Sequence, residues 1–164
     1  MASIFEFPNP VNDKAARVVA TGVVLLAVLF LITGWTILLW LLALGFLARV
    51  LSGPRFSPLG LLATKVIAPR LGEPRLTPGP PKRFAQAIGL VFSIAALIVA
   101  GTAGVGWAKV IIAGLTVAAT LEAALGFCCG CKVFSLLMRL GVIPESVCEE
   151  CANLSLRYPE LTRS

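Results

Sequence analysis

The sequence predicts an all-α membrane protein with four transmembrane helices, arranged as two hairpins, and a short helical tail that carries cysteines. Apolar residues make up 58% of the chain and charged residues only 13%, which is about half the roughly 25% usual in soluble proteins. Two long apolar stretches each contain a glycine near a tryptophan, where a chain can turn at the membrane surface. Between them lies a segment rich in proline, glycine and basic residues, as expected of a loop outside the bilayer.

The first hairpin is expected in the stretch from Val18 to Ala48, which contains no charged residue. One span needs about 20 residues, so this stretch is too long for a single helix unless that helix is strongly tilted. Gly34 and Trp35 mark the turn, which predicts helices at 15–33 and 35–51. The apolar run is too long for a removable signal peptide and lacks a small-residue cleavage site, so it is expected to be retained.

The loop from Arg49 to Arg83 carries seven basic residues and one acidic residue. Positive charge in short loops marks the cytoplasmic side of a membrane, so the loop and both chain termini are expected there. A short apolar stretch within it, Pro58 to Ala68, predicts a helix that lies on the membrane surface. Topology explains the basic residues better than binding does, and contacts with anionic lipid headgroups or a small anion are the alternative. The residues considered for such contacts are Arg55, Lys65, Arg70, Lys82 and Arg83.

The second hairpin is expected to consist of a helix at 84–100, a glycine-rich turn closed by Trp107, and a helix at 108–127. Both hairpins then start and end on the cytoplasmic side. This arrangement divides the chain into a membrane domain, 1–140, and a cytoplasmic tail, 141–164.

All five cysteines lie in a short stretch that follows the last predicted span. Two Cys-x-x-Cys pairs, Cys128/Cys131 and Cys148/Cys151, are separated by sixteen residues, a spacing found in zinc sites built from four thiolates. The same pairs are also suited to thiol–disulfide exchange or to carrying a persulfide in sulfur transfer. The sequence leaves these two alternatives open, with cysteine as a small apolar filler a weaker third.

The surroundings of the thiols give conflicting signals about their reactivity. Lys132 is adjacent to Cys131 and favours a thiolate, but a helix running to residue 127 would place Cys128 and Cys131 at its negative end, which opposes one. Glu122 is the only acidic residue within a predicted span, and it precedes Cys129 by two helical turns, so the two are expected on one face about 10 Å apart. Glu122 is therefore a candidate proton acceptor beneath the thiols. The alternative is a carboxylate that reaches water or an arginine of the basic loop.

Three motifs support a family resemblance: GPRFSPLGLL at 53–62, PPKRFAQAIGL at 80–90 and ALGFCCGCKVF at 124–134. Together they resemble the actinobacterial and cyanobacterial membrane family described as domain of unknown function 4395, over roughly residues 10–140. The resemblance implies a multi-pass protein of the bacterial plasma membrane, and a link to thiol or sulfur metabolism through thioredoxin-like or rhodanese-like partners. The family pattern Gly-Phe-Cys-x-Gly-Cys is matched by Gly126, Phe127, Cys128, Gly130 and Cys131, and Cys129 occupies its variable position.

The favoured function is a membrane-anchored thiol module that performs redox exchange or sulfur transfer with a soluble cytoplasmic partner. One alternative is a non-catalytic membrane scaffold in which the two cysteine pairs hold a structural zinc ion. Another is a small-anion carrier that uses the basic loop and Glu122, and that at this size is expected to form a homo-oligomer. The chain contains no histidine, which excludes histidine-based acid–base chemistry. Nucleic-acid binding is not expected, because the basic residues lie close to the membrane.

Overall fold

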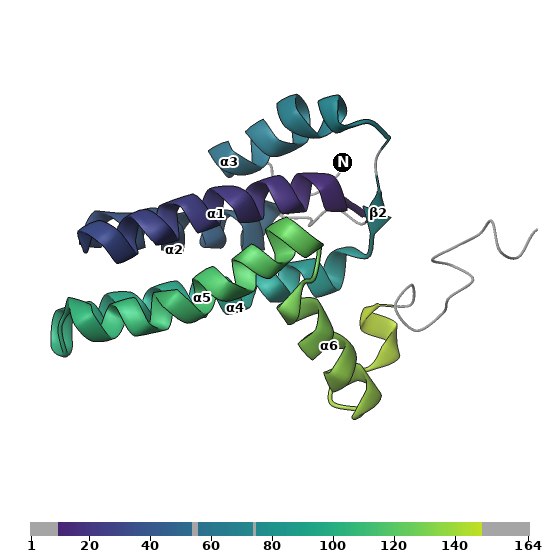
Figure 1. Ribbon diagram of the computed structural model, residues 1–164. Helices are drawn as coiled ribbons and strands as arrows, with labels where there is room; N and C mark the ends of the chain where they lie inside the picture. The colour runs from purple at the N-terminus through teal and green to yellow at the C-terminus, as the bar shows by residue number, and fades with distance from the viewer. Residues whose placement is uncertain (1–9, 54–55, 74, 149–164) are drawn as a thin grey trace, which may run out of the picture.

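The structure is a computed structural model that describes residues 10–53, 56–73 and 75–148. Four long helices form an elongated bundle, and a further helix departs from it at one end (Figure 1). The all-α prediction is thereby confirmed. The elements in chain order are β1 (Val11–Asn12), α1 (Asp13–Thr33), α2 (Thr36–Ser52), α3 (Pro58–Leu61), η2 (Leu62–Ile67), η3 (Ala68–Leu71), β2 (Leu76–Thr77), α4 (Gly79–Thr102), α5 (Val105–Leu125), α6 (Cys129–Arg139) and η4 (Glu145–Val147).

The first hairpin turns where the sequence predicts it. Asn12 caps α1, because its side-chain oxygen accepts a hydrogen bond from the backbone N–H of Lys14 at 3.0 Å. α1 ends at Gly34, whose φ of 72° is a left-handed conformation that glycine adopts without steric cost. The exposed Trp35 then begins α2. The break between the two helices is therefore confirmed, and one long tilted helix is excluded.

The segment from Pro58 to Leu71 forms one helical stretch, in which α3, the π-helical η2 and the 3₁₀ turn η3 follow one another. Pro58 lies in its first turn, where the missing N–H costs nothing. The stretch lies along α1 (Figure 1), and Ala63 and Ala68 pack there against Ala15 and Val19. The predicted helix within the loop is confirmed, while its position at a membrane surface stays a prediction.

The second hairpin differs from the prediction in its boundaries. α4 begins at Gly79, before the expected residue 84, because Pro80 and Pro81 fit the first turn of a helix. The chain turns at Gly104, which has a φ of 97°, so that Trp107 lies in the first turn of α5 and not in the connection. α5 ends at Leu125, before the expected residue 127.

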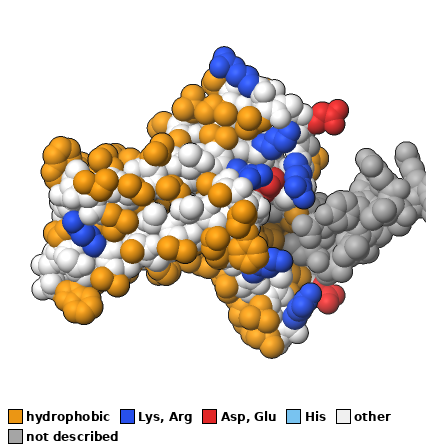
Figure 2. Space-filling view, in the orientation of Figure 1, with side chains coloured by type: hydrophobic (Ala, Val, Ile, Leu, Met, Phe, Trp, Pro, Cys, Tyr) orange, Lys and Arg blue, Asp and Glu red, His pale blue; other side chains and the backbone are white. Residues whose placement is uncertain are grey.

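The hairpins pack side by side through α1 against α5 and α2 against α4. One apolar core runs between them, with Ala27, Phe30, Leu39, Leu42 and Ile112 almost completely buried. The outer faces are also apolar (Figure 2), as expected of helices in contact with lipid. The side chains that are more than half exposed include Leu25, Ile32, Val91, Ile98 and Val110.

A short antiparallel ladder pairs Val11 with Thr77 and Asn12 with Leu76, and thereby joins the start of α1 to the start of α4. The backbone N–H of Asp13 adds a hydrogen bond of 2.7 Å to the carbonyl oxygen of Arg75. This ladder brings the starts of two helices to one end of the bundle. Most lysine and arginine side chains also gather near this end (Figure 2).

Helices α1, α4 and α5 are long and apolar enough to cross a membrane, and α2, with 17 residues, is a shorter apolar helix. A membrane span needs about 20 residues, with a lower limit of about 17, so the length of α2 lies at that limit. These lengths and compositions indicate a multi-pass membrane protein.

Candidate functional site

The last long helix stops before the thiols and does not continue through them. Gly126, with a φ of 66°, ends α5 because the left-handed conformation redirects the chain. Arg17 of α1 covers this helix end, since its guanidinium donates to the carbonyl oxygens of Ala123 at 3.2 Å and Ala124 at 2.6 Å. A new helix, α6, begins three residues later and diverges from the bundle (Figure 1).

Cys128 is the N-cap of α6. Its sulfur accepts a hydrogen bond from the backbone N–H of Cys131 at 3.3 Å, as a serine or aspartate side chain does at other helix starts. The helix dipole therefore presents its positive end to Cys128, which favours a thiolate. The expectation that both thiols lie at the negative end of a helix is wrong, because it assumed an unbroken helix through Gly126.

The two thiols also contact each other. The hydrogen bond from the Cys131 thiol to the Cys128 sulfur lowers the pKa of Cys128 and, together with burial, raises the pKa of Cys131. The positive charge of Lys82 also lowers the pKa of Cys128, whereas burial and the negative charge of Glu122 oppose this shift. Cys128 is thus the better nucleophile, and Cys131 is the partner that keeps its proton.

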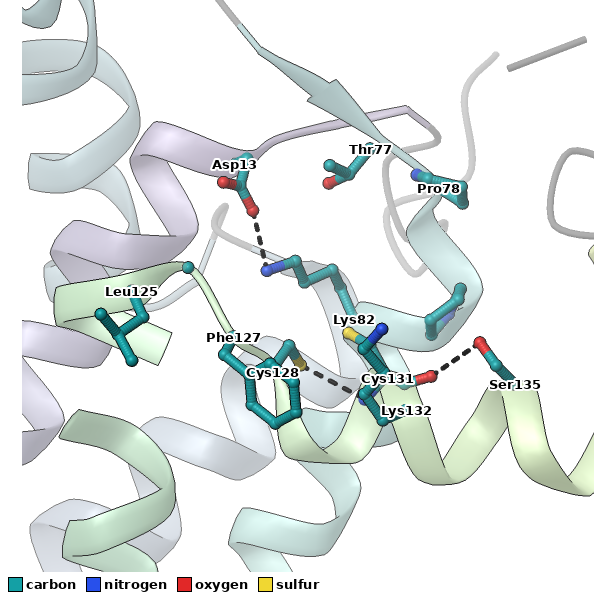
Figure 3. Close-up of a pocket in the computed structure, with 12 residues that line it drawn as sticks. Asp13, Thr77, Pro78, Lys82, Leu125, Phe127, Cys128, Cys131, Lys132 and Ser135 are labelled. Carbon is teal, nitrogen blue, oxygen red and sulfur yellow. Dashed lines mark hydrogen bonds and ion pairs between the residues drawn. The ribbon is translucent and has the colours of Figure 1, made fainter. Parts of the chain in front are cut away.

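Both thiols line a cavity of about 340 Å³ where α1, α4, α5 and α6 meet (Figure 3). Cys128 is only 7% exposed, so a reagent has to enter a cavity to reach it. Lys132 and Ser135 of α6 line the same cavity, and the Ser135 hydroxyl donates to the carbonyl oxygen of Cys131 at 3.0 Å. The cavity is thus polar on the side of α6.

A buried ion cluster lies beside the thiols. Lys82 Nζ is 3.1 Å from Asp13 Oδ1 and 2.7 Å from Glu122 Oε1, and none of the three side chains is more than 13% exposed. A buried ammonium is costly unless it is paired, and carboxylates from two other helices supply the pairing here. The cluster ties α4 to α1 and to α5 at the level of the thiols. In Figure 3, the side chains of Asp13 and Lys82 point toward one another across the cavity wall.

A second buried cation, Arg49 of α2, lies nearby. Its Nε donates to Gln86 Oε1 at 2.7 Å, its Nη1 donates to Ser57 Oγ at 3.2 Å, and its guanidinium carbon is 4.7 Å from the centre of the Phe46 ring. The charge of Glu122 also acts on Arg49. The polar layer therefore contains two cations and two carboxylates, and its net charge is zero. Its members, one from each long helix, are Asp13, Arg49, Lys82 and Glu122.

Sequence reasoning missed Asp13 and Arg49 as members of this layer. Asp13 precedes the predicted helix 15–33, and Arg49 lies where the predicted helix 35–51 overlaps the basic loop, so neither is expected in a buried layer. Two signals could have found them. Asp13 directly follows a helix-capping asparagine, and Arg49 is followed by Val50 and Leu51, which continue the apolar helix.

The five basic residues considered for lipid or anion contacts lie in different environments. Lys82 is buried in its two ion pairs. Arg83 is exposed and donates to a backbone carbonyl oxygen of α2 at 2.9 Å, while Lys65 and Arg70 are exposed on η2 and η3. Arg55 lies outside the described residues. The structure therefore brings Lys82 to the thiols and does not gather the other described members of the set there.

Glu122 and Cys129 do not share one helix face, because the break at Gly126 separates them. Instead, both line a second cavity of about 210 Å³ between the helices, together with Cys128. The partner of Glu122 is Lys82 of the basic loop, whereas the alternative interpretation of this carboxylate named water or an arginine of that loop. A role of Glu122 as proton acceptor stays a prediction.

The second cysteine pair is described only in part. Cys148 is buried and disulfide-bonded, whereas Cys151 lies outside the described residues. Cys128, Cys129 and Cys131 are free thiols. Within the part of the chain that the structure describes, no group of three or more histidine, cysteine or acidic side chains is arranged to hold a metal ion. The four-thiolate zinc set requires Cys151 and stays a prediction.

A protein-family model described as Domain of unknown function (DUF4395) matches residues 11–139. This range contains all four long helices and the Cys128/Cys131 pair, but neither Cys148 nor Cys151. The resemblance inferred from the three sequence motifs is thereby confirmed. No curated protein and no solved structure matches the chain.

Proposed function

This chain belongs to the DUF4395 family, and we propose from its geometry that it is a membrane-embedded thiol–disulfide exchange protein. In this proposal, Cys128 is the attacking thiolate and Cys131 is the resolving thiol. One observation carries it: the Cys128 sulfur receives hydrogen bonds from both the backbone N–H and the thiol of Cys131 at the start of α6. These bonds stabilise a thiolate at Cys128 and hold the second thiol within reach of it.

The exchange follows from this arrangement. The Cys128 thiolate attacks one sulfur of a partner disulfide, a mixed disulfide forms, and the other partner sulfur leaves as a thiolate. The Cys131 thiol then loses its proton and attacks the Cys128 sulfur. This step closes the Cys128–Cys131 disulfide and releases the second partner sulfur as a thiolate. The partner is reduced by two electrons, the dithiol is oxidised by two, and the sequence runs equally in reverse.

The ion cluster is proposed to adjust the reactivity of the pair. Lys82 stabilises the Cys128 thiolate by its charge, and Glu122 opposes it. A carboxylate in this position can also accept the proton that Cys131 loses in the second step, which is the role proposed for Glu122. The exposed Lys132 borders the cavity and favours the approach of an anionic partner segment.

We further propose that all four long helices span the bacterial plasma membrane and that the thiol end faces the cytoplasm. The support is the positive-inside rule, since the basic loop and the starts of α1 and α4 lie at the thiol end. The partner is then a cytoplasmic thioredoxin-like protein. A rhodanese-like protein would instead deliver sulfur, with Cys128 carrying it as a persulfide.

The disulfide at Cys148 favours exchange over a structural zinc ion, because a disulfide-bonded cysteine is not a thiolate ligand. A zinc scaffold built from Cys128, Cys131, Cys148 and Cys151 therefore requires that bond to be reduced first. Anion carriage has weaker support, because the charge of Lys82 is already balanced by two carboxylates.

The test is a redox titration of the purified protein in lipid nanodiscs, equilibrated in buffers of reduced and oxidised dithiothreitol. Free thiols are then alkylated and located by mass spectrometry, and the metal content is measured on the same sample. We expect a reversible disulfide between Cys128 and Cys131, which Cys128→Ser and Cys131→Ser each abolish. Cys129→Ser is the matched control and should leave the midpoint potential unchanged.

Two results would overturn this assignment. About one zinc ion per chain, with the thiols reactive only after chelation, would make the cluster structural. A persulfide on Cys128 that never resolves to a Cys128–Cys131 disulfide would move the assignment to sulfur transfer.

A further inference from the structure

An apolar cavity adjoins the thiols and has no role in the exchange with a soluble partner. Its volume is about 210 Å³, and residues of α1, α2, α4, α5 and α6 line it. Apart from the cysteines, its polar side chains are Gln86 and Glu122. Cys128 lines this cavity and the polar cavity as well. Cys128 therefore lies between a polar cavity and an apolar one.

The apolar cavity extends from the thiols into the depth of the bundle. On α4 its lining residues run from Ala85 to Phe92, which corresponds to about 10 Å at the helical rise. Phe92 and Val133 belong to the lining and are themselves exposed on the outside of the molecule. The lining of the cavity thus reaches the outer surface of the molecule at Phe92 and Val133.

Gln86 brings a side-chain amide to the lining of the cavity. Its Oε1 accepts from Arg49 Nε at 2.7 Å, which fixes the amide with its NH₂ group turned away from that guanidinium. The NH₂ group of this amide is a hydrogen-bond donor, and Gln86 lines both this cavity and a smaller one bordered by Val11 and Arg49. An apolar pocket between the helices of a bundle, with one or two placed polar groups, is the usual form of a small-molecule site.

We propose that this cavity binds the ring of a membrane quinone, which oxidises the Cys128–Cys131 dithiol. A quinone is apolar and flat, its carbonyl oxygens accept hydrogen bonds of the kind that Gln86 offers, and its tail can leave through the rim at Phe92 and Val133. An apolar cavity of about 150 Å³ is sufficient for benzene, so a cavity of about 210 Å³ holds one six-membered ring, with the ring substituents and the tail toward the rim. This inference rests on the proposed exchange function in its reverse direction, in which the Cys128–Cys131 disulfide oxidises a partner dithiol and the quinone then regenerates that disulfide.

The reaction balances without a further reagent. The Cys128 thiolate, the Cys131 thiol, one quinone and one proton give the Cys128–Cys131 disulfide and one quinol. Two electrons pass from the two sulfurs to the quinone. Of the two protons in the quinol, one comes from the Cys131 thiol and the other from water in the polar cavity.

The experiment uses the reduced full-length protein in anaerobic nanodiscs, with decylubiquinone as the probe. All ring positions of this quinone carry substituents, so thiols cannot add to a free ring carbon. Quinone reduction is followed by ultraviolet absorbance, and the disulfide is located by mass spectrometry. We expect one quinone reduced per Cys128–Cys131 disulfide formed.

Ala118→Leu on α5 fills the cavity, and Ala113→Leu is the matched control, because Ala113 is exposed on the same helix and does not line the cavity. We expect Ala118→Leu to slow oxidation by decylubiquinone about 10- to 200-fold, the range typical of a steric change in an apolar pocket. Its oxidation by oxidised dithiothreitol through the polar cavity should stay unchanged, and Ala113→Leu should match the wild type with both oxidants.

The outcomes separate this inference from the function on which it rests. If oxidised dithiothreitol forms the disulfide and decylubiquinone does not, the cavity holds lipid chains, and only the quinone proposal fails. If both leucine variants are slowed equally, the quinone reacts elsewhere and the proposal also fails. If neither oxidant forms a Cys128–Cys131 disulfide, the exchange function itself is wrong.

Discussion

Lys82 Nζ and Glu122 Oε1 lie 2.7 Å apart, almost hidden from solvent and next to the Cys128/Cys131 pair. The same ammonium lies 3.1 Å from Asp13 of the first hairpin. One cation therefore joins the two hairpins and also acts on the thiol that we assign as nucleophile. Stability and thiol chemistry depend on the same buried charges, and the two effects can be measured separately.

Lys82→Met should destabilise the protein strongly, because it leaves two buried carboxylates without their cation. Removal of one partner of a buried pair costs about 3–5 kcal/mol, and thermal unfolding in nanodiscs measures it. Lys65→Met is the control, since Lys65 is exposed and its replacement should change stability by less than about 0.5 kcal/mol. Equal unfolding temperatures for the two variants would show that the cluster does not stabilise the bundle.

The alkylation of Cys128 should depend on a hydrogen-bond donor at residue 131. Because the pKa of Cys128 is lowered, its thiolate persists at lower pH than that of an ordinary thiol, and the rate should fall only as the pH drops through the lowered value. Cys131→Ala removes the side-chain donor and should move the rate profile of Cys128 to higher pH. Cys131→Ser keeps an O–H donor and should move it less. Identical profiles for the two variants, measured with iodoacetamide and mass spectrometry, would contradict the assigned contact.

Gly130→Ala should displace α6 and impair the thiol pair. A Cβ atom at Gly130 would lie 2.6 Å from the Cα atom of Ala85 on α4, and a backbone atom cannot move aside as a side chain can. Overpacking of this kind costs about 1–3 kcal/mol. We also expect slower disulfide formation between Cys128 and Cys131, measured by alkylation after an oxidant pulse. In the control Gly106→Ala the added Cβ meets no atom within 4 Å, and this variant should behave as the wild type.

Gly126→Ala should destabilise the protein by about 1 kcal/mol, because alanine is strained in the left-handed conformation that ends α5. The space itself is adequate, since the nearest atoms to an added Cβ belong to Arg17 at 3.8 Å. Gly126→Asn is the matched comparison, because asparagine tolerates this conformation better. Thermal unfolding should therefore rank glycine above asparagine and asparagine above alanine. An alanine variant as stable as the wild type would show that the backbone at residue 126 can change without cost.

The hydrophobic pattern was sufficient to predict the helices, since apolar length and the Gly34–Trp35 turn are local signals. The end of α5 was harder to predict. Glycines occur within several of these helices without ending them, so Gly126 alone did not reveal a break, and only the φ of 66° distinguishes it. The break at Gly126 decides whether Cys128 lies at the negative end of α5 or at the positive end of α6. The predicted effect of the helix end on the thiols therefore had the wrong sign.

Local signals could mark single members of the ion cluster, but they could not show which of these residues meet. Asp13, Lys82 and Glu122 meet because the β1–β2 ladder fixes the start of α1 beside the start of α4, and because α1 packs against α5. Each of these is a long-range contact. The sequence marked Glu122 and Lys82 as unusual but could not pair them, since it contains no information on which hairpin faces which.

The three residues of the ion cluster lie far apart in the sequence, so they are synthesised at different times. Asp13 leaves the ribosome first, Lys82 follows with the second hairpin, and Glu122 and the thiols emerge last. Insertion of the first hairpin alone leaves Asp13 without its cation, and the cation arrives before the cysteines do. Asp13, Lys82 and Glu122 are therefore all synthesised before the first cysteine. A chain arrested before Cys128 contains no cysteine, so it has no thiol that could be oxidised prematurely.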